Sequence, residues 1–445
     1  MPLSYRHPSS FVFHRALGRD MPAIDHGAGA LLWDNEGKRY LDGSGGAVVV
    51  NIGHGRGEVA GAMALQAGRA AYVHGTHFSS DVLEEYARRL AAHAPGDCSR
   101  LYMVSGGSEA NETAVKMARA YHLANGQPER HKVIRRSISY HGNTLATLSL
   151  SGRPNLQAPY LPMLTVSPET PAPFCYHCPL GKSYPECGVA CVDELEAAIL
   201  REGPRTVSAF LAEPILGASA GAAVPPEDYA RRAREICDRH GVLYIDDEVM
   251  TGFGRTGRWF AIEWAGVVPD LVTCGKGMSG GYAPAGGVLA SPRIVETLAK
   301  SGGFTHGFTF SHHAVTAAAC LKTLEILEQE RLVERAQLLG ETLLSGLAAL
   351  SRHVHVGDVR GRGLFAGVEL VSDKASRRPF ARRERKAESV GARCFEAGLV
   401  SYPSGGCATG KDGDVLLLAP PFVVDEPQIA EMVGILDRVL GELGL

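Results

Sequence analysis

Short β-branched runs alternate with amphipathic stretches from about residue 60 to residue 320 of this 445-residue chain. Apolar positions with a period of two predict strands, and those with a period of three to four predict helices. Strands are predicted at 100–107, 131–139, 206–214, 241–249 and 270–276, and helices at 109–124 and 227–240. This order of elements is typical of a mainly parallel sheet covered by helices, so we expect an α/β fold.

The pattern changes after a long predicted helix at about 313–330. The segments 356–370, 381–398 and 414–422, with a last helix from Pro427, indicate a smaller α+β domain. The opening segment holds a predicted hairpin at 33–46 and is expected to join that domain. The predicted division is an N-terminal segment at 1–55, a large domain at 56–325 and a small domain at 326–445.

Charge is close to balance, with 45 basic and 48 acidic residues. A near-neutral chain gives no electrostatic support for a nucleic-acid or membrane-surface partner. No apolar run reaches the roughly 18 residues that a membrane span needs. The first residues hold no apolar segment of the secretory kind, so we expect a cytoplasmic protein.

Four cysteines cluster in a predicted insertion at 172–192, with the spacing C-x2-C-x8-C-x3-C. Three alternatives stay open: a structural zinc held by thiolates, two local disulfides, or four reduced thiols. No catalytic metal is expected, because no metal-binding helix motif is present. The four are Cys175, Cys178, Cys187 and Cys191.

Lys276 is the candidate for covalent chemistry. A short apolar strand leads it into a glycine-rich turn, in the run DLVTCGKGMSGG, with no charged residue beside it. A poorly hydrated ammonium group has a lowered pKa, and the neutral amine that results is a nucleophile. Such a lysine captures an aldehyde cofactor as a Schiff base. The alternative is a purely structural lysine at a strand end.

A phosphate site is predicted in SGGSEANE, at 105–112. Backbone amides and the positive end of the helix dipole suit a phosphate dianion, with Gly107 and Ser108 as the close contacts. The alternative is an ordinary tight turn with a serine N-cap. The segment lacks both the dinucleotide and the P-loop glycine orders, which disfavours a nucleotide.

Three further strand ends carry candidate ring-binding residues. Tyr140 could stack on a flat ring, beside the imidazole of His141, or simply pack. Asp247 is the second of three consecutive acids at the end of a predicted strand. Because successive side chains of a strand point to opposite faces, Asp247 and Val249 are expected on the same face. Asp247 could hold a ring nitrogen protonated, or cap the next turn instead. Glu213, in AEPI, is a plausible neighbouring acid.

These features together describe one ligand that has a phosphate, a flat ring with a basic nitrogen, and an aldehyde. That ligand is pyridoxal 5′-phosphate. All five features fall at the carboxyl ends of predicted strands, where active sites of open α/β sheets gather.

At this point the chain resembles the class III aminotransferases among the fold-type I pyridoxal-phosphate enzymes, and most of all the omega-amino-acid and amine transaminases. The resemblance runs from LWDNEGKRYLDGSGG through SGGSEANETAVKMARAYH, YHGNT, DDEVMTGFGRTGRWF and GKGMSGGYAPAGGV to HGFTFSHH and LLLAPPF. It implies a large domain with a mainly parallel seven-stranded sheet, and a smaller α+β domain.

The resemblance also implies roles. Lys276 would hold the cofactor and shuttle the proton during transfer, and Asp247 would pair with the pyridine nitrogen. Tyr140 and Val249 would sandwich the ring. Gly107 and Ser108 would bind the phosphate, with His141 and Glu213 in the surrounding network. Thr309 would reach across from a second subunit, so a homodimer, or a tetramer built from dimers, is implied.

Departures from the family concern the substrate. Some members carry an arginine for the substrate carboxylate where this chain has Leu417, or just before G-D, where Gly410 and Lys411 stand. A carboxylate would then be held by Lys411, by an arginine elsewhere, or weakly. His312 replaces a usual glycine in S-G-H.

The leading hypothesis is transfer of an amino group from an amine or omega-amino acid to a 2-oxo acid such as pyruvate or 2-oxoglutarate. The main rival is an aminomutase, racemase or amino-phosphate lyase on the same scaffold. A binding module without catalysis is disfavoured by the intact Lys276 and Asp247. A nicotinamide-dependent oxidoreductase is disfavoured by the missing dinucleotide motif.

Overall fold

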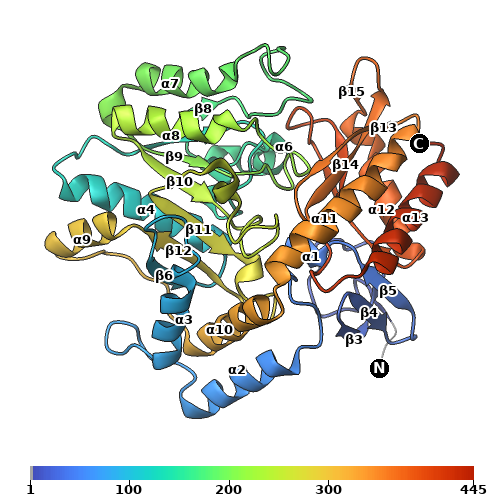
Figure 1. The fold of residues 1–445 in the computed structure, drawn as a ribbon, viewed down its shortest axis with the longest axis horizontal. Coiled ribbons are helices and arrows are strands. Elements are labelled where there is room, and N and C mark those ends of the chain that lie inside the picture. The colour runs from blue at the N-terminus through green and yellow to red at the C-terminus, as the bar shows by residue number, and fades with distance from the viewer. Residues whose placement is uncertain (1–3) are drawn as a thin grey trace.

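The computed structural model describes residues 4–445. Its central feature is a seven-stranded sheet in the order β6-β12-β11-β10-β9-β7-β8 (Figure 1). Strand β12 runs antiparallel to both of its neighbours, and the other adjacent pairs are parallel. The seven strands are β6 Arg100–Val104, β7 Lys132–Arg136, β8 Glu169–Thr170, β9 Val207–Ala212, β10 Leu243–Asp247, β11 Leu271–Gly275 and β12 Gly286–Ala290. The prediction of a mainly parallel seven-stranded sheet is confirmed.

Helices cover both faces of this sheet, because its central strands are apolar on both sides. On one face Leu211, Ile245 and Leu271 pack with the helices α4 and α9. On the other face Phe210 and Tyr244 pack with α7, α8 and α10. The large helices around the sheet are α2 Gly57–Arg69, α3 Asp81–Ala91, α4 Gly107–Ala124, α7 Ala190–Glu202, α8 Asp228–His240, α9 Pro292–Lys300 and α10 Ala314–Gln329.

The C-terminal part builds a second sheet in the order β13-β14-β18-β17, with β15 also paired to β14. The segment 356–370 forms two antiparallel strands, because a turn containing Gly363 at φ 59° folds the chain back. Helices α11 and α12 pack on this sheet, and α13 packs on those two helices. The elements are β13 Val356–Gly361, β14 Ala366–Asp373, β15 Arg378–Pro379, β17 Tyr402–Gly405, β18 Asp414–Leu418, α11 Leu332–Ala348, α12 Lys386–Glu396 and α13 Glu426–Glu442.

The opening segment pairs with the C-terminal part. The predicted hairpin is formed by β4 Leu31–Asp34 and β5 Arg39–Asp42, extended by β3 Ile24–Ala28. The fourth strand of this sheet, β16 Leu399–Val400, runs parallel to β5. The two ends of the chain therefore meet in one sheet, at the right of Figure 1. The short elements are β1 Ser4–Tyr5, β2 Met21–Pro22, α1 Gly45–Val48, α5 Leu145–Ser149 and α6 Pro154–Gln157.

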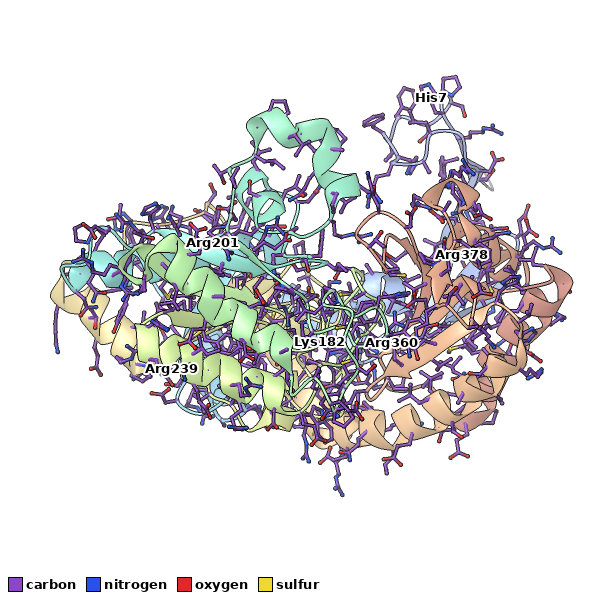
Figure 2. All side chains as sticks on the ribbon, turned by 90° about the horizontal axis from the view of Figure 1, so that it is seen from above. His7, Lys182, Arg201, Arg239, Arg360 and Arg378 are labelled. Carbon is purple, nitrogen blue, oxygen red and sulfur yellow. The ribbon has the colours of Figure 1, made fainter. Side chains whose placement is uncertain are left out.

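The cysteine-rich insertion connects the large sheet to the C-terminal sheet. Figure 2 shows the loop around Lys182 where the two parts meet, near the strand that carries Arg360. The buried Glu369 carboxylate lies 2.5 Å from His177 Nε2 and 2.7 Å from Arg360 Nη1. Burial alone would raise the pKa of Glu369, but Arg360 and His177 hold it below its ordinary value. The Arg360 guanidinium also lies over the ring of Phe174.

The four clustered cysteines line one small cavity of about 20 Å³. All ten cysteines of the chain are free thiols, which argues against the two local disulfides. Within residues 4–445, no three His, Cys, Asp or Glu side chains come together in a way that would hold a metal ion. Nor does any helix of that range combine the length and the apolar character needed to cross a bilayer.

Helix α11 approaches the β13–β14 turn so closely that only glycine fits at position 340. A Cβ on Gly340 would lie 2.3 Å from the carbonyl carbon of Gly363 and 2.4 Å from its Cα. Gly434, in α13, has open space at the same place.

We therefore expect opposite effects from the same substitution in two helices. Gly434→Ala should stabilise the protein by about 0.5–1 kcal/mol, because alanine is the better helix former. Gly340→Ala should destabilise it by about 1–3 kcal/mol, because the overpacking outweighs that gain. The midpoints of urea unfolding measure both, and a rise for Gly340→Ala would contradict the packing described here.

Candidate active site

Three adjacent parallel strands end at one edge of the large sheet, and each end carries a predicted site residue. Asp246 of β10 lies opposite Ala212 of β9, and Asp247 lies opposite Thr273 of β11. Glu213 follows β9 directly, and Lys276 follows β11. This register brings Glu213, Asp247 and Lys276 to the same edge.

Lys276 is held in an unusual backbone conformation. Its φ is 46°, a left-handed value that side-chain-bearing residues rarely adopt and that clusters at functional sites. Its Nζ donates a hydrogen bond to the carbonyl oxygen of Ala47 at 2.7 Å. Burial lowers the pKa of Lys276 to about 8, against the opposing attraction of Asp247 and Glu213. A substantial neutral fraction is therefore present near neutral pH.

The Asp247 carboxylate is fixed by three donors. Its Oδ2 lies 2.7 Å from His141 Nδ1 and accepts from Asn111 Nδ2 at 2.8 Å. Its Oδ1 accepts from the backbone amide of Val249 at 3.1 Å. A carboxylate has about four acceptor positions, so one remains for a further donor. Asp247 is therefore an oriented acceptor with room for one more donor.

Asn111 is a site residue that the sequence reasoning missed. Its Oδ1 accepts from Thr273 Oγ1 at 2.9 Å, which orients the amide. Its Nδ2 then donates to Asp247 and to the carbonyl oxygen of His141, each at 2.8 Å. The available signal was its position in SGGSEANE, one helical turn after the predicted phosphate contacts.

Glu213 connects the Tyr140 segment to the sheet. Its Oε1 accepts from the backbone amide of Tyr140 at 3.1 Å, and its Oε2 accepts from that of Gly217 at 2.8 Å. Burial raises the pKa of Glu213, although the nearby His141 and Arg136 oppose the rise. The side chain thus fixes the backbone from which Tyr140 projects.

The beginning of α4 packs against Val249 and the end of β11 without room for side chains. A Cβ on Gly107 would lie 2.7 Å from Val249 Cγ1. A Cβ on Gly275 would lie 3.2 Å from the same atom and 3.5 Å from the Gly107 amide nitrogen. Ser108 Oγ accepts from the backbone amide of Asn143 at 3.1 Å. The backbone amides at the start of this 18-residue helix can donate hydrogen bonds to an anion beside Val249.

The groups gathered at this edge fit a flat ring that carries a phosphate and a basic nitrogen. The α4 amides suit the phosphate, the free acceptor position of Asp247 suits the nitrogen, and Val249 supplies an apolar face. The buried Nε2 of His141 has no hydrogen-bond partner in the described chain. His141 pairs with Asp247 through its other ring nitrogen, Nδ1, and this contact orients the carboxylate.

The other two acids of the triplet lie behind the site. Asp246 and Glu248 are fully buried, and burial raises the pKa of Glu248 to about 7. Burial and the nearby Glu248 also raise the pKa of Asp246. Glu248 accepts from the Ile262 amide at 2.8 Å and from Thr251. Glu248 therefore has structural partners, whereas neither carboxyl oxygen of Asp246 has a hydrogen-bond partner among the described residues.

Arg255 joins the site to the C-terminal part and was also missed. Its Nη1 donates to the carbonyl oxygens of Leu364 at 3.0 Å and Pro420 at 2.7 Å, and its Nη2 to that of Val50 at 2.9 Å. Its guanidinium lies 4.5 Å from the centre of the Phe422 ring. Burial lowers the pKa of Arg255 to about 9. Only its position in GFGRTG could have suggested this role.

Thr309 and His312 lie on the loop before α10. Thr309 is exposed, and it has no side-chain hydrogen bond within the described chain. His312 has φ 61°, so the place where relatives carry glycine keeps a glycine-like backbone conformation.

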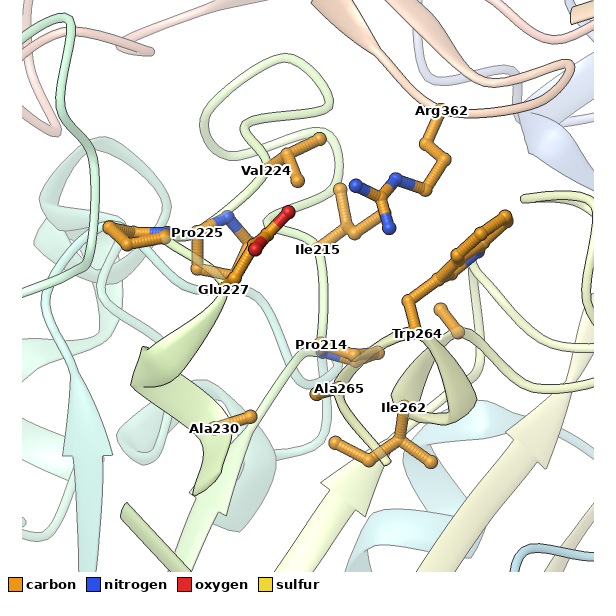
Figure 3. A pocket seen from close by; sticks show the side chains of 12 residues that line it. Pro214, Ile215, Val224, Pro225, Glu227, Ala230, Ile262, Trp264, Ala265 and Arg362 are labelled. Atoms are coloured by element: carbon orange, nitrogen blue, oxygen red, sulfur yellow. The ribbon is translucent and has the colours of Figure 1, made fainter. Parts of the chain in front are cut away.

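A separate cavity of about 220 Å³ lies next to the site and contains none of the predicted residues. Figure 3 shows Arg362 and Trp264 together on one side of this cavity and Glu227 on the other. The guanidinium of Arg362 stacks on Trp264 at 4.5 Å from the ring centre. The converging strand ends, rather than this cavity, therefore locate the candidate active site.

Comparison with known proteins gives a consistent result. Residues 16–440 match the family described as aminotransferase class-III. A probable aminotransferase of Mycobacterium tuberculosis is 41% identical over 98% of this chain and 92% of its own. A putrescine–pyruvate aminotransferase of Pseudomonas aeruginosa is 36% identical over 94% of this chain and 90% of its own.

A solved structure agrees with these relatives. The (S)-enantioselective omega-transaminase from Thermomicrobium roseum superposes with a TM-score of 0.90 at 39% identity, covering 98% of this chain and 96% of that one. The chain therefore belongs to the class III aminotransferases and is a pyridoxal-phosphate-dependent enzyme of the fold-type I group.

Proposed function

We propose that this enzyme moves an amino group from an amine or omega-amino acid to a 2-oxo acid such as pyruvate or 2-oxoglutarate, with Lys276 as the residue that binds the cofactor covalently. The observation that carries the proposal is the Lys276 amine itself. Its pKa is lowered to about 8 by burial, and it stands at the strand edge that also carries Asp247.

Pyridoxal phosphate supplies an aldehyde that condenses with amines and a ring that draws electrons from the substrate carbon. Lys276 Nζ would hold the cofactor through its aldehyde carbon, and once released by the substrate amine it would carry the proton at the substrate carbon that bears nitrogen. Asp247, fixed by Asn111 and His141, would keep the ring nitrogen protonated. Tyr140 and Val249 would cover the two ring faces, and Gly107 and Ser108 would hold the phosphate.

A small aliphatic amine is the favoured donor and pyruvate the favoured acceptor, since a relative of 36% identity is named for putrescine and pyruvate. The rival reactions on this scaffold need no oxo acid. Dependence of product formation on an added oxo acid therefore separates transfer from racemisation, mutation or elimination.

Purified enzyme incubated with a panel of amines and omega-amino acids should form alanine from pyruvate, or glutamate from 2-oxoglutarate, in equal amount to the donor consumed. Lys276→Ala should form none. Amino-acid analysis of the products measures the transfer. Donor conversion without any oxo acid, or undiminished transfer by Lys276→Ala, would contradict the proposal.

Two acid-to-amide variants test Asp247 within the same assay. Asp247→Asn should lower kcat by about 10²- to 10³-fold, because the ring nitrogen loses its charged partner when electrons move into the ring. Glu213→Gln is the matched control and should lose less than about tenfold, because it holds backbone amides rather than the ring. Equal losses of kcat in the two variants would contradict the assignment of Asp247 as the partner of the ring nitrogen.

We further propose a homodimer in which Thr309 reaches the phosphate bound by the partner. Thr309 is exposed, and the adjacent Phe310 is 58% exposed while its ring contacts Tyr72 at 6.0 Å. Exposed large aromatic groups are typical of protein interfaces. Sedimentation equilibrium should give twice the chain mass of 47.3 kDa. A fully active monomer would contradict this arrangement.

Two further expectations stay predictions. One is the cytoplasmic location, which fractionation of the native cells would test. The other is the division into residues 1–55, 56–325 and 326–445, which limited proteolysis would test by the positions of the first cuts.

A further inference from the structure

Arg153 is a half-buried arginine that has no acid to pair with. Within residues 4–445, no carboxylate lies within salt-bridge distance of it, whereas most arginines of the chain are paired. Its Nη2 donates to the carbonyl oxygen of Gly405 at 2.8 Å and lies 3.4 Å from Ser404 Oγ. The other guanidinium nitrogens have no protein partner and are not sealed from solvent. Donors are therefore free for an anion.

The local fold puts this guanidinium beside Tyr140. The amide of Gly152 donates to the carbonyl oxygen of Ser139 at 2.9 Å, and the amide of His141 donates to Ser151 Oγ at 3.0 Å. These bonds hold residues 151–153 alongside residues 139–141. Arg153 is close enough to lower the pKa of Tyr140, which burial raises. The free donors thus lie on the Tyr140 side of the proposed ring site.

The same region contacts the loop in which some relatives carry a substrate-binding arginine. Asn155 Nδ2 donates to the carbonyl oxygen of Lys411 at 3.0 Å, and a Cβ on Gly410 would lie 3.0 Å from Pro154 Cδ. Leu417, the other place for such an arginine, is fully buried in the second sheet. Neither Gly410 nor Leu417 can supply a cation, but Arg153 stands against this loop.

We propose that Arg153 binds the carboxylate next to the reacting carbon of the 2-oxo acid acceptor. The proposal rests on the transaminase function proposed above and deepens it by assigning the residue that recognises this carboxylate. A guanidinium binds a carboxylate through two parallel hydrogen bonds, and such charge-assisted pairs are the stronger kind. The partial burial of Arg153 limits screening by water and salt.

Arg153→Met should raise the KM for pyruvate by about 10- to 100-fold, the loss expected for one charge-assisted pair, and change kcat less. The KM for an amine donor without a carboxylate should stay within about twofold. Arg153→Lys should recover part of the pyruvate affinity. Calorimetric titration of the holoenzyme with pentanoate, an unreactive carboxylate, should show weakened binding in Arg153→Met.

Lys411→Met tests the competing assignment, because Lys411 is the other cation considered for the carboxylate and lies on the neighbouring loop. It should leave the KM for pyruvate and the pentanoate affinity near the wild-type values. Unchanged pentanoate affinity in Arg153→Met, in a protein with a wild-type circular dichroism spectrum, would overturn the proposal. So would an equal or larger loss in Lys411→Met. Failure of the proposed function would instead appear in the wild type, as no oxo-acid-dependent transfer with any donor.

Discussion

The site depends on the burial of one amine. Lys276 directly follows a fully buried strand, and desolvation outweighs the attraction of Asp247 and Glu213, so that its pKa falls to about 8. An amine at the surface would be charged at neutral pH and would not react with an aldehyde. The left-handed backbone at Lys276 and the glycine contacts around it, which cost stability, are consistent with a position kept for chemistry.

The parallel sheet places the other site residues at the same edge as this amine. Because β9, β10 and β11 are neighbours in register, Glu213, Asp247 and Lys276 lie together at the carboxyl ends of these strands. The acids in turn are fixed by side chains from the elements that pack on the sheet, among them Asn111 of α4. Arg255 donates to three carbonyl groups on segments distant in sequence, so this edge of the large sheet is held against the N-terminal and C-terminal segments.

Local sequence features predicted the sheet and most of the edge residues. Apolar strands that end in Glu213, Asp247 and Lys276 are visible in the sequence because each is a buried run followed by a polar residue. Asn111, Arg255 and Arg153 were missed because their roles come from partners more than a hundred residues away, such as Asp247, Pro420 and Gly405. The segment 356–370 was assigned only to the smaller domain, and its hairpin depends on a glycine turn whose backbone conformation the sequence pattern does not specify.

The most direct test of the account is to find where the cofactor is attached. Reduction of the purified holoenzyme with borohydride makes the link between cofactor and protein permanent, and peptide mass mapping then locates it. The account predicts one pyridoxyl group per chain, on the peptide that contains Lys276. A reduced adduct on another lysine, or no adduct in an enzyme that still transfers amino groups, would contradict it.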